Sequence, residues 1–368
     1  MSIIRGAATH DGRTAPALAA FERLADHYVV PRADVLLMAI NLYGITSPFD
    51  HHRARLSVTL VGLPDTPWQV IVPLNAPASP FVFDGEVLRV SGEIVAQVRR
   101  VNADEAVGGY FRDGGRAATL NPNARSRCVG CAFCPNTLEA AADPRMAEER
   151  GLTELLHALT EQHPQKDLTQ LREVTVSTGC FERESAAVEH LVALRRVLGE
   201  FGVMARIGFL TSVLRTPSAF ATLAQEVSPF TLRLTAECFT RRDLLLKASK
   251  AELAIEQMPE NLRLAREAGH DASFTYIVGL DDLEAMRAGL VALAPHVSAF
   301  PNFQVYQAHN QIMGGLRASG AQDLEFYLTA RRVIEEIYEP SGLRPAAWEC
   351  YRPLWHYSFA DENLVEAR

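Results

Sequence analysis

Residues 1–115 carry short hydrophobic runs that are rich in β-branched and aromatic residues and are separated by turn residues. Runs of this kind, bounded by Pro, Gly and Asp, are typical of β-strands. Four segments show the pattern, at residues 33–45, 54–63, 68–75 and 81–101. We therefore expect a small antiparallel unit in the first part of the chain.

From Thr119 onward, strand-like hydrophobic runs alternate with longer segments of helical periodicity. The expected strands cover residues 172–179, 204–212, 230–237, 273–280 and 302–308, and the expected helices cover residues 147–163, 185–202, 217–227, 251–269, 283–294 and 323–339. One further strand just before the first cysteines brings the count to about six βα units. The alternation predicts an α/β fold, a partial (β/α)6 TIM-like barrel with an N-terminal β-rich domain.

These patterns divide the chain into three regions. Residues 1–115 form the expected β-rich domain, residues 116–345 the partial barrel, and residues 346–368 a C-terminal tail. The tail is rich in aromatic residues, with Trp348, Tyr351, Trp355 and Tyr357. A chain of 368 residues is long enough for this organisation and for a large buried core.

The composition is that of a folded protein, with 48% hydrophobic and 22% charged residues. A net charge of −8 lacks the basic balance of proteins that neutralise phosphate backbones, so we expect no nucleic-acid partner. The first residues contain no apolar core of a signal peptide, and no stretch reaches the length of a membrane span. We therefore expect a cytoplasmic protein with no membrane partner.

The candidate chemistry lies in the segment Arg127–Pro135, which holds Cys128, Cys131 and Cys134. Thiolates this closely spaced in a loop can ligate one metal ion or cluster. In the similar ferredoxin run a fourth cysteine follows after three intervening residues, but here that position is Leu138. The motif therefore predicts an iron–sulfur cluster with three protein ligands and one open iron, which can coordinate a substrate or cofactor directly.

A zinc site is the alternative, because zinc also takes thiolate ligands. Its fourth ligand would be distant in the sequence: Cys180, Cys238, Cys350 or a histidine. No second CxxC pair or nearby histidine completes a zinc motif of the usual spacing, which favours the cluster.

The segment from Thr119 to Tyr338 resembles the radical S-adenosylmethionine (radical SAM) superfamily. In that family three cysteines in the loop after the first barrel strand bind a [4Fe-4S] cluster, and an aromatic residue precedes the third, where this chain has Phe133. The family usually has three residues between its first two cysteines, whereas this chain has only Val129 and Gly130. The shorter spacing leaves open that a different C–S bond of SAM is cleaved.

The resemblance also implies where S-adenosylmethionine would bind. It assigns the methionine amino group to the turn with Gly179 and Glu182, and the ribose or amino-acid end to Glu237. It assigns the adenine to the strand end at Val278 and Gly279. The cations available for the methionine carboxylate are Arg241, Arg242, Lys247 and Lys250, and Arg242 and Lys250 are the chosen candidates.

By the same resemblance the chain is a radical SAM enzyme that removes a hydrogen atom from a small-molecule or peptide substrate in a biosynthetic pathway. Its electron would come from an external reductant such as a flavodoxin or ferredoxin. Cys180 and Cys238 follow two barrel strands, so either is a candidate hydrogen donor to a radical, and the alternative for both is a buried structural cysteine. The N-terminal domain could cover the barrel mouth, recognise a carrier or peptide, or mediate dimerisation.

Overall fold

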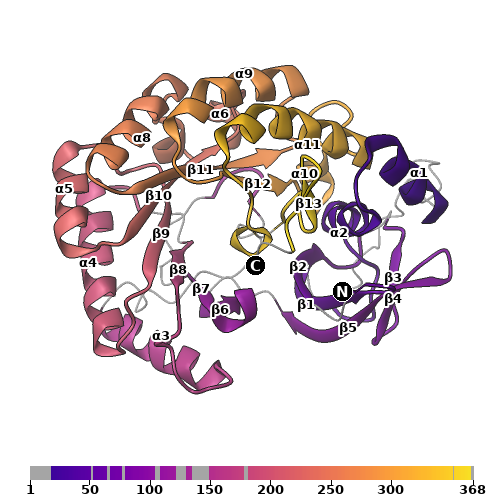
Figure 1. Ribbon diagram of the computed structural model, residues 1–368, viewed down its shortest axis with the longest axis horizontal. Coiled ribbons are helices and arrows are strands. Elements are labelled where there is room, and N and C mark those ends of the chain that lie inside the picture. Colours follow the sequence, from indigo (N-terminus) through magenta and orange to yellow (C-terminus); the bar gives the residue numbers. More distant parts are fainter. Residues whose placement is uncertain are drawn as a thin grey trace, which may run out of the picture.

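The computed structural model describes residues 18–50, 53–63, 67–76, 79–103, 108–121, 130–134, 149–177, 181–350 and 352–365. Two main sheets organise these residues (Figure 1). One is a five-stranded antiparallel sheet with strand order β2-β1-β5-β4-β3, and the other is a seven-stranded sheet with strand order β12-β11-β10-β9-β8-β7-β6. The expected combination of an α/β partial barrel and a β-rich N-terminal unit is confirmed.

The N-terminal sheet follows the expected strand pattern. Its strands are β1 Arg53–Leu60, β2 Trp68–Pro73, β3 Phe81–Phe83, β4 Val87–Val90 and β5 Glu93–Ala103. Two helices precede them, α1 Leu18–Tyr28 and α2 Arg32–Tyr43. The strand expected at residues 33–45 is therefore wrong, because α2 occupies most of that segment. A continuous apolar run does not distinguish a buried helix from a strand, and here residues 33–42 are buried on every side of the helix.

The second sheet supplies six parallel strands, β7 Ala117–Asn121, β8 Glu173–Val176, β9 Arg206–Thr211, β10 Phe230–Glu237, β11 Asp271–Val278 and β12 Asn302–Val305. An additional strand, β6 Gly108–Arg112, pairs antiparallel with β7 at the edge. The long helices lie outside the curved sheet (Figure 1): α3 Glu149–Gln162, α4 Glu184–Glu200, α5 Pro217–Glu226, α8 Met258–Glu267, α9 Leu283–Leu293 and α11 Leu324–Tyr338. The count of six βα units is confirmed.

Shorter elements complete the barrel region and the tail. They are the helices α6 Arg242–Leu245, α7 Ala248–Ala251 and α10 Gln311–Gly314, and the hairpin strands β13 Ser358–Phe359 and β14 Glu362–Asn363. The helix expected at residues 251–269 is regular only in α8, after the short 3-10 turn Ile255–Gln257. The sheet pairing of β6 begins before residue 115, and the domain boundaries as such stay a prediction.

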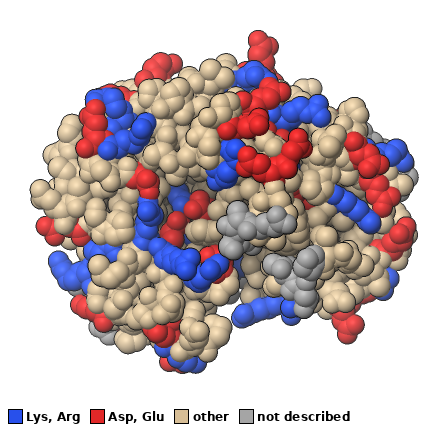
Figure 2. All heavy atoms as spheres, viewed as in Figure 1, with Lys and Arg blue, Asp and Glu red and all other residues tan. Residues whose placement is uncertain are grey.

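The inner face of the half-barrel is polar, and Figure 2 shows basic and acidic side chains in the central hollow of the molecule. Arg233 on β10 donates to Glu173 on β8 at 3.0 Å, and both side chains are buried. Since successive side chains of a strand alternate between the two faces, Thr235 shares the inner face with Arg233, while Leu232 and Leu234 pack against the helices. The β10 sequence thus predicts an apolar outer face and a polar interior.

The C-terminal tail lies between the half-barrel and the N-terminal sheet (Figure 1). Trp68 Nε1 on β2 donates to the Tyr357 hydroxyl at 2.6 Å, and the backbone N–H of Val305 donates to the carbonyl of Arg352 at 2.9 Å. The tail therefore joins the two sheets. Among the helices of the described ranges, none combines the length and apolar character that a membrane crossing requires.

Candidate functional site

The cysteine loop follows β7 at the carboxyl ends of the parallel strands, the edge where βα proteins carry their active sites. The structure describes residues 130–134 of this loop, and Cys128 lies outside the described residues. Cys131 is buried and Cys134 is half-buried. The Cys134 N–H donates to the Cys131 carbonyl at 2.9 Å, so the two cysteines lie on one tight turn.

The turn packs against the segment that follows β10. The backbone N–H of Lys247 donates to Cys131 Sγ at 3.4 Å, and the Ala132 N–H donates to the Leu245 carbonyl at 2.9 Å. Burial raises the pKa of the Cys131 thiol, while the charge of Lys250 lowers it. Two of the three motif cysteines are therefore placed beside a lysine-bearing segment more than a hundred residues away in sequence.

Phe133 and Cys238 belong to one buried apolar cluster under the cysteine turn. Its members are Cys131, Phe133, Cys238, Leu245, Leu246, Ile277, Leu280, Tyr306 and Met313. Burial, followed by the charge of Asp281, raises the pKa of Cys238 to about 12, so the thiol keeps its hydrogen at neutral pH. The other hydrogen-donor candidate, Cys180, lies outside the described residues, as does Gly179.

Glu237 and Lys250 form an ion pair next to the cysteine turn. Lys250 Nζ lies 2.6 Å from Glu237 Oε1, and the two side chains are 12% and 9% exposed. Glu237 sits at a bulge at the end of β10 with a φ of 63°. Burial lowers the pKa of Lys250, but Glu237 and the Cys131 thiol outweigh this and raise it. The structure brings these two predicted site residues together, and Lys250 compensates the buried charge of Glu237.

Arg242 is held by backbone carbonyl groups. Its guanidinium donates to the carbonyls of Cys238 at 2.8 Å, Lys250 at 3.1 Å and Leu253 at 3.0 Å, and also to that of Ala236. It therefore fastens the segment between β10 and α8 that carries Lys247 and Lys250. A role for Arg242 in binding a carboxylate stays a prediction.

The ammonium group of Lys247 has no hydrogen bond or ion pair within the part of the chain that the structure describes. The side chain is nevertheless buried, and burial, followed by the charge of Lys250, lowers its pKa. Glu182, an exposed residue after β8, lies within electrostatic range and raises that pKa. Among the cations that the sequence offers for a carboxylate, the structure thus distinguishes Lys247 by its unpaired ammonium.

The end of β11 is shaped by Val278 and Gly279. Val278 is fully buried, and Gly279 has a φ of 109°, which disfavours residues with a side chain. A Cβ at this position would lie 2.5 Å from the Tyr327 hydroxyl and 3.2 Å from Tyr306 Cβ. A glycine is therefore required at this strand end by both conformation and space.

Asp281 is a structural residue of the site that the sequence analysis missed. Its buried carboxylate accepts hydrogen bonds from the backbone N–H of Phe239 at 2.6 Å and of Thr240 at 2.9 Å, and from the Tyr276 hydroxyl at 2.8 Å. These bonds tie the turn after β10 to β11. An acidic residue two positions after a strand-ending glycine was the available signal.

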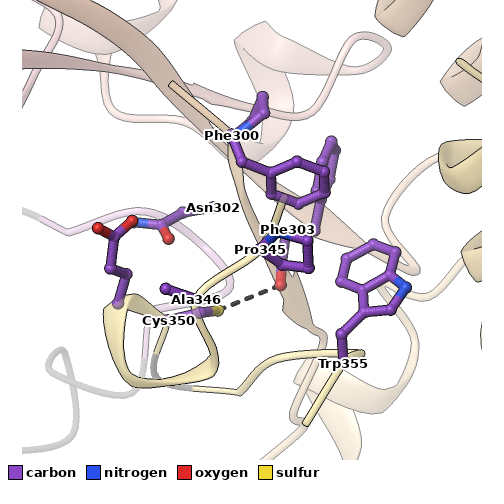
Figure 3. A pocket seen from close by; sticks show the side chains of 9 residues that line it. Phe300, Asn302, Phe303, Pro345, Ala346, Cys350 and Trp355 are labelled. Atoms are coloured by element: carbon purple, nitrogen blue, oxygen red, sulfur yellow. Dashed lines mark hydrogen bonds between the residues drawn. The ribbon is translucent and has the colours of Figure 1, made fainter. Parts of the chain in front are cut away.

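A separate pocket lies at the amino-terminal end of β12, where Asn302 begins the strand, and so at the opposite end of the strand from the cysteine loop (Figure 3). Phe300, Pro345, Ala346 and Trp355 line it, with Cys350, whose thiol donates to the Phe303 carbonyl at 3.1 Å. The Cys350 side chain is thereby fixed in this pocket.

Within the described ranges, no three His, Cys, Asp or Glu side chains lie close enough together to hold a metal ion. Cys131 and Cys134 are in these ranges, whereas Cys128 is not. The described residues therefore contain a pair of neighbouring thiols, and the third predicted ligand stays a prediction.

No protein-family model matches the sequence, and no curated protein sequence matches it. Solved structures with a similar arrangement include Streptococcus suis SuiB bound to S-adenosylmethionine, at 13% identity over 60% of this chain and 46% of that chain, with a TM-score of 0.40. Escherichia coli HemN, a coproporphyrinogen III oxidase described as a radical SAM enzyme, is 15% identical over 61% of this chain and 54% of that chain, with a TM-score of 0.39.

The FeFe-hydrogenase maturase HydG from Carboxydothermus hydrogenoformans is 15% identical over 68% of this chain and 63% of that chain, with a TM-score of 0.38. The chain spans about half the length of SuiB. At this degree of similarity, a function must be argued from the residues of this chain.

Proposed function

We propose that the chain is a radical SAM enzyme that holds a [4Fe-4S] cluster with Cys128, Cys131 and Cys134. The proposal has as its main support the contact between the cysteine turn and the segment after β10, where the Lys247 N–H meets Cys131 Sγ at 3.4 Å. This contact places neighbouring thiols, a buried ion pair and an unpaired ammonium at the carboxyl ends of a parallel half-barrel.

The described residues fit an iron–sulfur cluster in two respects. Thiolates are the ligands such clusters require, and a backbone N–H donated to a ligating sulfur is one of the contacts that set a cluster's reduction potential. The apolar cluster around Phe133 would restrict access of water to one side of the site. The bound cluster would supply the electron, passed on from an external flavodoxin or ferredoxin, that breaks a C–S bond of S-adenosylmethionine.

The neighbouring residues then take defined roles in holding S-adenosylmethionine. Lys247 is our preferred partner for its carboxylate, because that ammonium is buried without a counter-ion among the described residues. Glu182 and Glu237 would face its amino and ribose groups, and Val278 and Gly279 would face its adenine. Lys250 would hold Glu237 in position, at 2.6 Å.

The substrate is proposed to be a small molecule or peptide that loses a hydrogen atom inside the barrel, in a biosynthetic pathway. The buried Cys238, which keeps its S–H hydrogen, is the described candidate for a hydrogen donor. The N-terminal unit contributes to the barrel mouth, since Gln307 Nε2 donates to the Asn41 carbonyl at 2.7 Å and the Ile71 carbonyl at 2.6 Å. This contact favours a covering role for that unit.

Anaerobic reconstitution with iron and sulfide tests the proposal. We expect a brown protein that contains a four-iron cluster and, after reduction, converts S-adenosylmethionine to methionine and 5′-deoxyadenosine. Other cleavage products would mean that a different C–S bond is broken. A colourless protein with stoichiometric zinc and no cleavage of S-adenosylmethionine would refute the proposal.

Replacing Lys250 by methionine is expected to slow cleavage of S-adenosylmethionine by about 10- to 100-fold while leaving the iron content close to that of the wild type. The substitution removes the cation that holds Glu237 and leaves that carboxylate buried without a partner. Iron content, visible absorbance and the rate of methionine release are measured on the same preparation.

Two further variants control for folding. Lys166→Met removes an exposed lysine that pairs with Glu161 and should leave every measurement unchanged. The double variant Lys250→Met with Glu237→Gln removes both charges, so it should recover stability without recovering activity. Wild-type rates in Lys250→Met would contradict the assigned role.

A further inference from the structure

Arg352 lies where the C-terminal tail, the end of β12 and the N-terminal unit meet. Its carbonyl accepts the N–H of Val305, and its guanidinium donates to Gln304 Oε1 at 2.8 Å and to Gln307 Oε1 at 3.3 Å. Gln304 pairs in register with Ile277 of the cluster under the cysteine turn, so both side chains share the inner face of the sheet. Arg352 therefore reaches the interior of the half-barrel from the tail.

Among the residues that the structure describes, Arg352 has no carboxylate partner. Arg233 pairs with Glu173 at 3.0 Å, and Arg331 pairs with Asp34 at 2.8 Å, so two other buried guanidinium groups are each compensated. The guanidinium of Arg352 donates to the neutral amide oxygens of two glutamines, and within the described ranges its Nε is buried without a hydrogen-bond partner. Arg352 is half-buried, and the burial of its guanidinium lowers its pKa, because a cation withdrawn from water without a counter-ion is destabilised.

The groups around Arg352 do not supply the missing negative charge. After burial, the largest influence on the pKa of Arg352 comes from Cys350, but burial raises the pKa of that thiol to about 12, so it carries no negative charge at neutral pH. Arg53, at the start of β1, lowers the pKa of Arg352. Glu237 is within electrostatic range, but its carboxylate is already paired with Lys250. Cys134 also lies within this range, which places Arg352 near the cysteine turn.

The inner face of the half-barrel offers further hydrogen-bonding groups. Thr235 on β10 pairs in register with Thr275 on β11, and Thr119 on β7 pairs with Thr175 on β8, so all four side chains face inward. The hydroxyls of Thr119, Thr235 and Thr275 are buried and have no hydrogen-bond partner in the part of the chain that the structure describes. Buried polar groups are normally hydrogen-bonded, so these hydroxyls are available to bind a polar ligand in the interior.

We propose that Arg352 binds a carboxylate of the substrate inside the half-barrel, so that the substrate is a carboxylate-bearing small molecule or peptide. The planar guanidinium matches a carboxylate with two parallel hydrogen bonds, and the free Nε provides one of the required donors. This proposal rests on the proposed function in one respect, namely that the molecule carrying the bound carboxylate is the substrate of the enzyme. It is distinct from the carboxylate of S-adenosylmethionine, for which Lys247 is our candidate.

The test measures binding of acetate and hexanoate to the reconstituted protein by calorimetry, with acetamide and hexanamide as neutral counterparts. We expect each carboxylate to bind about 10-fold or more tightly than its amide, the discrimination expected for a hydrogen bond to a charged group. Arg352→Gln should abolish this preference and leave the affinity for S-adenosylmethionine unchanged. Arg344→Gln, which removes an arginine paired with Glu362 on the surface of the same tail region, should keep the preference.

Equal binding of acid and amide, or an unchanged preference in Arg352→Gln, overturns the assignment. A loss of affinity for S-adenosylmethionine in that variant also overturns it, because Arg352 would then serve the cofactor. Arg352→Gln should be at least as stable as the wild type, since it removes a half-buried charge that no described carboxylate compensates; a strongly lowered unfolding temperature would make Arg352 a structural residue instead. Absence of the cluster in wild-type protein refutes the proposed function. The assignment of Arg352 is decided separately, by the measured preference for carboxylates over amides.

Discussion

Replacing Cys131 or Cys134 by alanine is expected to remove the iron–sulfur cluster and, with it, all measurable cleavage of S-adenosylmethionine. Changes around a metal site that leave its ligands in place typically cost 10- to 100-fold in affinity or activity, so loss of a ligand should cost about 100-fold or more. Cys131 is the more sensitive position, because its Sγ also accepts the Lys247 N–H at 3.4 Å. Iron and sulfide content, visible absorbance and methionine release measure the effect.

Cys350→Ala is the matched control, since this half-buried cysteine bonds to the Phe303 carbonyl at the other end of β12. It should keep the colour and the activity of the wild type. If Cys350→Ala loses metal together with the motif variants, the site is a closed zinc centre with a distant fourth ligand. A brown, active Cys131→Ala protein would show that the cysteine is no ligand at all.

The repetitive part of the fold could be predicted from the sequence because each barrel strand is short, apolar and followed by a helix of clear periodicity. The strand expected at residues 230–237 coincides with β10, and residues 217–227 contain α5. Helix α2 could not be distinguished from a strand in this way. Because it is buried on all sides, it lacks the polar face by which a helix is recognised in a sequence. Tertiary packing, rather than local pattern, decides such a segment.

The candidate site, too, could be predicted from the sequence only in part. Spacing and position after strands indicate the cysteine motif, Glu237 and Lys250 as candidate site residues. The contacts among them are long-range in sequence. Neither the pairing of Lys250 with Glu237 nor the bond from Lys247 to Cys131 follows from spacing. The position of Arg352 could not be predicted, because nothing in the aromatic-rich tail indicates that the side chain of one arginine points into the half-barrel.

The largest effect on stability is expected for Asp34→Asn, a nearly isosteric change. The buried carboxylate of Asp34, on α2, lies 2.8 Å from Arg331 Nη1 on α11. It also accepts the backbone N–H groups of His356 at 2.9 Å, Tyr357 at 2.8 Å and Ser358 at 3.2 Å. One carboxylate thus joins the N-terminal unit, the barrel and the tail.

An asparagine at position 34 would remove the more deeply buried of the two carboxylates that Arg331 contacts, the other being Glu335 at 2.9 Å, and would turn amide hydrogens toward donors. Breaking a buried pair by removing one partner costs about 3–5 kcal/mol, so we expect the free energy of unfolding to fall by about that amount in chemical denaturation. Residues 352–365 should also become cleavable by protease before the barrel unfolds, because their backbone N–H groups lose their acceptor. Glu260→Gln, which neutralises an exposed carboxylate bonded to Arg263, should leave the unfolding curve in place. Superimposable curves for Asp34→Asn and the wild type would mean that the tail is held by its aromatic contacts alone, such as the packing of Trp355 against Phe300 at 5.5 Å.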